Sequence, residues 1–187
     1  MDHNTASTAL HLVVDDGGAN RQLFAALQQQ GLQTVLLPAS SDLTSLEQAV
    51  SAAANHTPLR SLHLYSHAAP GRLRLGSIEV DPAAMRSNPA PWQSIGQHLQ
   101  PGGDVLIYGC NLARGESGRQ WLHQFANISG VDVAASTNPS GFGGDWILEE
   151  HAGLIETNPP DLLTGLAWPG QLSIVNKPVS VPLHWVD

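Results

Sequence analysis

Short apolar runs alternate with segments of helical periodicity along most of the chain. Each apolar run is followed by turn residues, as is typical of buried strands, and the runs lie at 10–14, 34–37, 62–65, 104–108 and 131–135. Apolar residues recur at helical spacing in the segments 20–30, 43–53, 82–88, 92–99 and 115–128. Expected N-caps are Asn20, Ser41 or Asp42, and Asp81. This alternation predicts an α/β fold with a mostly parallel sheet and helices on both of its faces.

Two hairpins and a tail complete the predicted organisation. Residues 72–80 alternate around a Gly-Ser turn and predict a surface hairpin, and 146–149 with 154–156 predict a C-terminal hairpin. From residue 157 onward the chain is rich in proline and has no helical period. We therefore predict one α/β domain over 1–156 and a proline-rich tail or linker over 157–187.

Composition and charge exclude several classes of protein. Hydrophobic residues make up 42% of the chain, which is too many for a disordered protein. The net charge is −8 and the only lysine is Lys177, so we expect neither nucleic acid nor an anionic membrane as a partner. No apolar run approaches the ~20 residues that span a bilayer, so no membrane insertion is expected. The N-terminus does not look like a conventional secretory signal, and export by another route stays open.

The single cysteine and one histidine follow neighbouring strands of the predicted sheet. His67 comes after the strand at 62–65, and Cys110 comes after the strand at 104–108. Catalytic groups gather at the carboxyl ends of parallel strands, and an imidazole can activate a cysteine thiol for attack on a carbonyl. The alternative is that Cys110 is a small core residue and His67 an ordinary loop histidine. A paired Cys110 should titrate below the ~8.5 of a free thiol.

Three segments carry a family resemblance: Leu-Tyr-Ser-His-Ala-Ala-Pro-Gly (64–71), Leu-Ile-Tyr-Gly-Cys-Asn-Leu-Ala (106–113) and Gly-Gly-Asp-Trp-Ile-Leu-Glu (143–149). With them, the stretch from about residue 10 to 156 resembles the bacterial domain of unknown function 4347 family. Members of that family lie near the N-termini of large, repeat-containing surface or secreted proteins. The family is distantly similar to the caspase-like cysteine peptidases. The resemblance implies a caspase-like three-layer sandwich in a bacterial protein that is secreted or on the cell surface; a cytoplasmic location stays open.

The resemblance also implies a catalytic pair, His67 and Cys110, with the backbone N–H groups of Ala68 and Cys110 as oxyanion donors. Related enzymes usually have glycine after the histidine, where this chain has Ala68. If that position requires a positive φ, alanine is strained there and its N–H points elsewhere. Ala68 therefore favours the alternative of a catalytically inactive binding or folding module of a large adhesin. A third hypothesis is a small-molecule hydrolase or transferase that uses the same cysteine.

Further polar residues near the same edge are candidates for substrate binding. Asp15, with Asp16 beside it, follows the first strand and could orient an imidazole, bind a cation or recognise a basic side chain. The resemblance to caspase-like peptidases further implies that Asp145, with Ser136 and Thr137 near it, forms part of a pocket that favours Arg or Lys before the scissile bond. The plainer alternative for the aspartates is turn capping.

No metal site and no cofactor are expected, and calcium dependence is left open. His63 and His67 have a His-x-x-x-His spacing, but on a strand they would lie ~13 Å apart, too far to share an ion. The expected substrate is a peptide or protein segment, including the protein's own polypeptide. Because the tail at 158–187 has no core of its own, we expect it to lie near the active edge as a cleavage segment or a masking strand.

Overall fold

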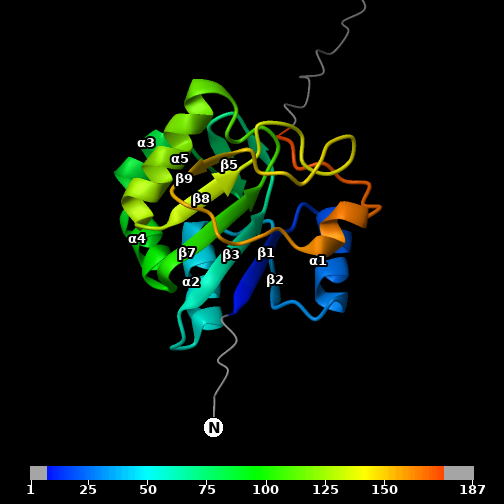
Figure 1. Ribbon diagram of the computed structural model, residues 1–187, viewed down its shortest axis with the longest axis horizontal. Helices are drawn as coiled ribbons and strands as arrows, with labels where there is room; N and C mark the ends of the chain where they lie inside the picture. The colour runs from blue at the N-terminus through cyan, green and yellow to red at the C-terminus, as the bar shows by residue number, and fades with distance from the viewer. Residues whose placement is uncertain (1–7, 175–187) are drawn as a thin grey trace, which may run out of the picture.

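The computed structural model describes residues 8–174, which form a mostly parallel six-stranded sheet in the order β2-β1-β3-β7-β8-β9 (Figure 1). Its strands are β1 (Ala9–Val14), β2 (Thr34–Leu37), β3 (Leu59–Tyr65), β7 (Leu99–Tyr108), β8 (Asp132–Ala135) and β9 (Glu150–Ala152). Five of the six are the predicted apolar runs, so the α/β expectation is confirmed. A small antiparallel sheet of β4 (Ala68–Ala69), β5 (Arg72–Leu75) and β6 (Ile78–Val80) contains the predicted hairpin at 72–80.

The predicted C-terminal hairpin is wrong in detail. Residues 146–149 and 154–156 form no strands, and β9 between them pairs antiparallel with β8. Trp146 and Leu148 instead pack against a second core cluster on the face of the sheet that carries Tyr65 and Tyr108. Packing on that face accounts for Trp146 and Leu148, whereas Ile147 and Leu154 are exposed.

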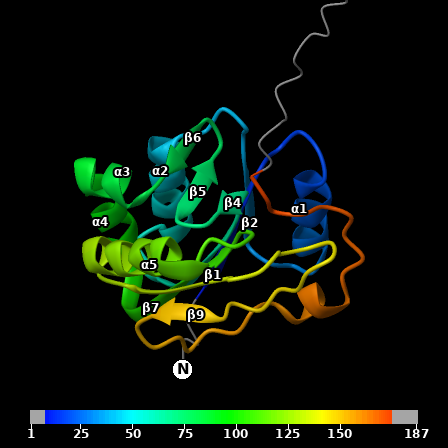
Figure 2. The ribbon, with the colours of Figure 1, turned by 90° about the horizontal axis from the view of Figure 1, so that it is seen from above.

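Helices cover both faces of the sheet, as the alternation predicted. On one side lie α2 (Leu43–Ala54), α3 (Pro82–Ser87), α4 (Ala90–Gln97) and α5 (Gly115–Ser129), and on the other lies α1 (Asn20–Gln29) (Figure 2). Asp42 and Asp81 cap α2 and α3 by accepting from Ser45 N and Ala84 N. Asn20 was expected to cap α1 and does not, because its buried side chain donates to Val14 O and joins α1 to β1.

The part of the predicted tail that the structure describes is packed as a layer of the domain. Residues 157–174 run along the side of the sheet that carries α1 and include the short helix η1 (Asp161–Gly165) (Figure 2). Leu163, Trp168 and Leu172 are buried there, and the Trp168 indole donates to Ala19 O at 2.6 Å. Because α1 alone does not cover this face, an irregular segment with buried apolar residues completes the core. The rest of the predicted tail lies outside the described residues.

A polar aromatic cluster is buried on the same face of the central strands. His11 Nδ1 lies 3.1 Å from the Tyr65 hydroxyl, and His63 Nδ1 lies 3.1 Å from the Tyr108 hydroxyl. The two imidazoles stack at 4.3 Å and the two phenols at 4.5 Å. Burial lowers the pKa of His11 to about 4 and that of His63 to about 3, and burial raises the pKa of both tyrosines. Both histidines are therefore neutral in the folded protein.

Within residues 8–174, no helix is both long enough and apolar enough to cross a membrane.

The buried cluster of two histidines and two tyrosines predicts a loss of stability in mild acid. Unfolded histidines take up protons below about pH 6.5, whereas the folded rings do so only near their lowered pKa values. The stabilisation is therefore complete above about pH 6.5 and decreases as the pH falls. Between pH 6.5 and 5 we expect the unfolding free energy to drop by about 1 kcal/mol per pH unit for each ring, because the unfolded ring is only half protonated at pH 6.5. Urea unfolding at several pH values measures this drop.

A His11→Gln/His63→Gln double variant should lose most of this pH dependence, while the exposed His123→Gln control should keep it. An unfolding free energy that stays constant between pH 6.5 and 5 in the parent protein contradicts the assignment of two neutral buried rings.

Candidate active site

The ends of β3 and β7 bring His67 and Cys110 to one edge of the sheet. The two strands are parallel neighbours with Tyr65 opposite Tyr108, so the residues that follow them leave the sheet side by side. Gly109 makes this approach close: a Cβ there would lie 2.7 Å from the Ala68 Cβ and 2.9 Å from Ser66 O. A glycine before the cysteine is thus required by the proximity of the two loops.

Two backbone N–H groups at this edge donate to one carbonyl oxygen. Ala68 N lies 3.1 Å from Leu172 O, and Cys110 N lies 2.7 Å from the same atom. These are the two donors expected to form the oxyanion hole, and the oxygen between them belongs to the C-terminal segment. Paired donors that converge on one oxygen are the arrangement that stabilises the anion formed during acyl transfer.

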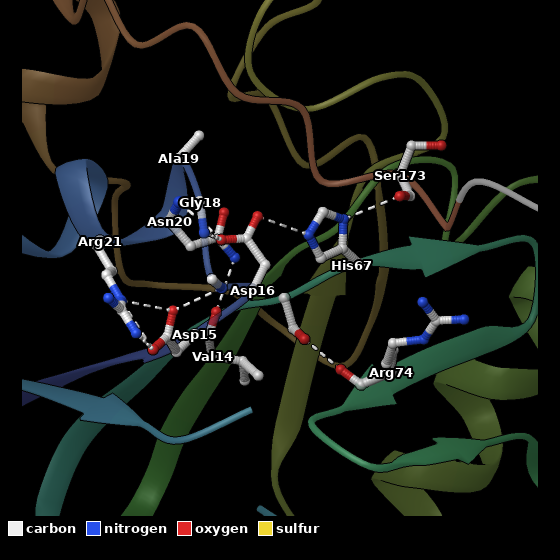
Figure 3. A network of polar contacts seen from close by, with 12 residues as sticks. Val14, Asp15, Asp16, Gly18, Ala19, Asn20, Arg21, His67, Arg74 and Ser173 are labelled. Atoms are coloured by element: carbon white, nitrogen blue, oxygen red, sulfur yellow. Dashed lines mark hydrogen bonds and ion pairs between the residues drawn. The ribbon is translucent and has the colours of Figure 1, made fainter. Parts of the chain in front are cut away.

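His67 lies beside Ser173, the residue that follows Leu172 in the C-terminal segment (Figure 3). Its Nδ1 is 2.9 Å from Ser173 O, and its Nε2 is 3.2 Å from Asp16 Oδ2. A carbonyl and a carboxylate both accept hydrogen bonds, so both contacts are satisfied together only when both ring nitrogens carry protons. The imidazole is thereby oriented by Asp16 and faces the C-terminal segment.

The Cys110 thiol is in contact with Ser140. Ser140 N donates to Cys110 Sγ at 3.1 Å, and the sulfur is 3.5 Å from Ser140 O. The residue is 1% exposed, and this burial raises the pKa of the thiol, although backbone N–H groups partly oppose the shift. The expected lowered pKa is therefore not found in this arrangement, in which both nitrogens of the His67 ring contact other residues.

Residues 170–174 cross the edge as a segment held by isolated β-bridges and backbone hydrogen bonds. On one side of Leu172, Leu172 N donates to Ser140 O at 3.1 Å and Phe142 N donates to Gly170 O at 2.7 Å, with Gln171 paired antiparallel to Gly141. On the other side, Ile174 N donates to Ala68 O at 2.9 Å. This is how peptides bind by adding a strand to a sheet edge.

Ala68 occupies an ordinary strand conformation. It belongs to β4, and its φ is not among the positive values of the described residues. The concern that alanine after the histidine is strained, with its N–H turned away, is therefore not supported. The N–H of Ala68 has the orientation that an oxyanion donor needs.

The carboxylates of Asp15 and Asp145, which were expected to bind substrate, form hydrogen bonds and ion pairs with neighbouring residues. Asp15 forms an ion pair with Arg21 at 2.8 Å and accepts from Gly17 N, so Asp16 and not Asp15 reaches His67 (Figure 3). Asp145 accepts from Asn138 Nδ2 and Ile147 N, as a turn aspartate does. Neither contact joins these carboxylates to the segment at 170–174.

The two hydroxyl residues also lie apart from the bound strand. Ser136 is buried and its Oγ is 3.0 Å from Asn138 O, while Thr137 N donates to Glu149. The residue that contacts both the thiol and the segment is Ser140, which the sequence analysis did not select. Two features could have indicated this region. Pro139, a turn residue, directly precedes Ser140, and the apolar residues Trp168 and Leu172 of the tail are buried.

A cavity of about 1090 Å³ lies next to the site rather than in it. It lies between the sheet at Leu106 and Ala134 and the segments 141–148 and 157–169. His67 and Cys110 do not line it, because residues 172 and 173 fill the edge between them. Residues 8–174 contain no group of three or more His, Cys, Asp or Glu side chains placed to hold a metal ion.

The close approach at Gly109 gives a test of this geometry. Gly109→Ala should destabilise the protein by about 1–3 kcal/mol, because the new methyl group overlaps Ala68 and Ser66 O in a packed region. Urea unfolding measures the loss. Gly165→Ala is the matched control, since a Cβ there meets nothing within 4 Å. Equal stability of the two variants is incompatible with the contact between the loops.

Comparisons with known proteins place the chain in a family without adding a function. A diflavin flavoprotein A3 from Nostoc sp. is similar at 14% identity over 67% of this chain and 73% of its own, with a TM-score of 0.32. A protein assigned to GMP synthase from Thermoplasma acidophilum matches at 14% identity over 70% of this chain and 49% of its own, with a TM-score of 0.26. These scores are too low to support an argument, and a search of curated proteins finds no match. A family model matches residues 12–166, and the chain belongs to the family described as Domain of unknown function (DUF4347).

Proposed function

We propose that this protein is a caspase-like cysteine endopeptidase or autoprocessing module in which Cys110 and His67 are the catalytic residues. The observation that carries the proposal is the Leu172 carbonyl oxygen, which accepts from both Ala68 N and Cys110 N. A peptide carbonyl is thus bound by two amides, that of the residue after His67 and that of Cys110 itself. The substrate is a peptide or protein segment that adds a strand to this edge.

Each residue of the edge has a role in amide cleavage. The Cys110 sulfur attacks the carbonyl carbon, and the two N–H groups stabilise the negative charge that forms on its oxygen. In its neutral form, with the proton on Nε2 toward Asp16, His67 receives the thiol proton on Nδ1 and delivers it to the leaving amine. Asp16 is a positioning residue, since it contacts the far nitrogen of the imidazole. The secreted or surface location implied by the resemblance stays a prediction.

Burial of the thiol favours a second candidate, a catalytically inactive module. The thiol is almost fully buried with a raised pKa, and the C-terminal strand occupies the site. In this alternative residues 170–174 are a permanent part of the core, and the edge serves only to bind them. The two candidates differ in one property, which is whether Cys110 forms a covalent bond with a peptide carbonyl or its analogue.

Covalent labelling distinguishes the candidates. A peptidyl acyloxymethyl ketone that carries the sequence of residues 169–172 should modify the full-length protein at Cys110, as read by intact mass and peptide mapping. Cys110→Ala should abolish labelling, and His67→Ala should slow it by 10²-fold or more, in the range typical of general acid–base catalysis. The exposed His123→Ala control should label at the parent rate. Labelling of the parent that His67→Ala leaves unchanged argues against the pair.

The ordinary conformation of Ala68 predicts that glycine is no improvement at this position. Ala68→Gly should leave the labelling rate within about twofold of the parent rate, since the N–H of Ala68 already faces the carbonyl. It should lower the unfolding free energy by about 0.5–1 kcal/mol, because glycine in a strand loses more conformational entropy on folding. Labelling kinetics and urea unfolding measure the two effects. A tenfold faster reaction would show that alanine holds the donor away from its working position.

A further inference from the structure

We propose, on the basis of the peptidase function above, that the protein cleaves its own chain between Leu172 and Ser173. The site holds an uncleaved peptide with the Leu172 carbonyl between the two donors and Ser173 beside the imidazole. The residue whose carbonyl oxygen lies between the oxyanion donors supplies the acyl group, so Leu172 precedes the scissile bond.

Contacts on both sides of this bond hold the peptide unit in place across the edge. Before the bond, Gly170 and Leu172 pair with Phe142 and Ser140. After it, Ser173 pairs with Ala68 in parallel, and Ile174 N donates to Ala68 O. The backbone is thus fixed on the acyl side and on the leaving side of the same peptide unit. Holding both sides in an extended form brings the reacting groups together without a second molecule.

The groups around this peptide unit suffice for a balanced hydrolysis. The step begins with a neutral His67 ring, protonated on Nε2 toward Asp16 and with Nδ1 released from Ser173 O. The Cys110 thiol passes its proton to Nδ1, and its sulfur forms a bond with the Leu172 carbonyl carbon. The bond from that carbon to Ser173 N then breaks, and His67 gives its proton to the departing amine. Water attacks the resulting thioester, His67 takes up the proton of the water and returns it to the sulfur, and Leu172 leaves as a carboxylic acid that ionises.

The surroundings of Leu172 favour substrates that have an apolar residue directly before the cleaved bond. Its side chain is fully buried in the cluster that includes Leu106, Tyr108 and Trp168. Asp145 was expected to select Arg or Lys at this place, but Asn138 and Ile147 already occupy its carboxylate. A charged residue at 172 would be buried without a partner, which is strongly unfavourable.

The test is incubation of the purified full-length chain at pH 5 to 9, with and without calcium, followed by intact mass and terminal sequencing. The parent should release a fragment that begins at Ser173, and Cys110→Ala should stay intact. Leu172→Met should cleave at nearly the parent rate, whereas Leu172→Asn should cleave at least tenfold more slowly. Leu163→Asn is the matched control, because Leu163 is a buried leucine of the same cluster outside the bound strand.

Each outcome decides between the inferences. Cleavage after Leu172 that depends on Cys110 and on residue 172, but not on Leu163, supports the proposal. An intact parent chain, cleavage at another bond, equal cleavage of Cys110→Ala, or equal slowing by Leu163→Asn overturns it. If the intact parent is still labelled at Cys110 by the ketone, the peptidase function remains and only self-cleavage fails. If it is neither cleaved nor labelled, both fail.

Discussion

The hydrogen bonds from two backbone amides to the Leu172 carbonyl oxygen are the interaction on which the functional geometry depends. They require β3 and β7 to be parallel neighbours in register, so that the residues after Tyr65 and Tyr108 leave the sheet at the same level. They also require a glycine at 109, because any Cβ there would separate the two loops. The positions of His67, Cys110 and Ser140 follow from this arrangement. His67 contacts Ser173, Ser140 pairs with Leu172, and the Cys110 thiol contacts Ser140.

The C-terminal segment has two roles that are physically coupled. Leu163, Trp168 and Leu172 cover the sheet face beside α1, and the same segment carries a peptide bond across the active edge. Burial of these side chains therefore sets the register in which the backbone enters the site. The same burial keeps the Cys110 thiol away from water and raises its pKa. In the proposed self-cleavage, an external peptide would therefore compete with the chain's own segment for the site.

Sequence patterns predicted the sheet, its edge and a place for the tail near that edge, but not which residues of the tail would lie there. Apolar runs and turn residues indicated five of the six main strands, and the carboxyl ends of β3 and β7 place His67 and Cys110 at the same edge of the sheet. Contacts set by tertiary packing were missed. Asn20 looks like a cap from its neighbours alone, but burial turns its side chain to Val14. The stretch after residue 157 has no period, and only the open face beside α1 explains why it packs there.

The choice among nearby polar residues was equally beyond sequence patterns. Asp15 and Asp16 are chemically identical neighbours, and the ion pair of Asp15 with Arg21 leaves Asp16 to meet His67. The strain expected for Ala68 depended on an assumed φ, which the pairing of β4 with β5 does not require.

NMR scalar couplings across hydrogen bonds test whether both amides donate to Leu172 O, in an isotopically labelled Cys110→Ala chain that keeps every backbone amide and cannot form a thioester. The account predicts couplings from the amide nitrogens of residues 68 and 110 to one and the same carbonyl carbon, that of Leu172, together with slow exchange of both amide protons. Couplings to other carbonyls, or two rapidly exchanging amides with no coupling, would contradict the account.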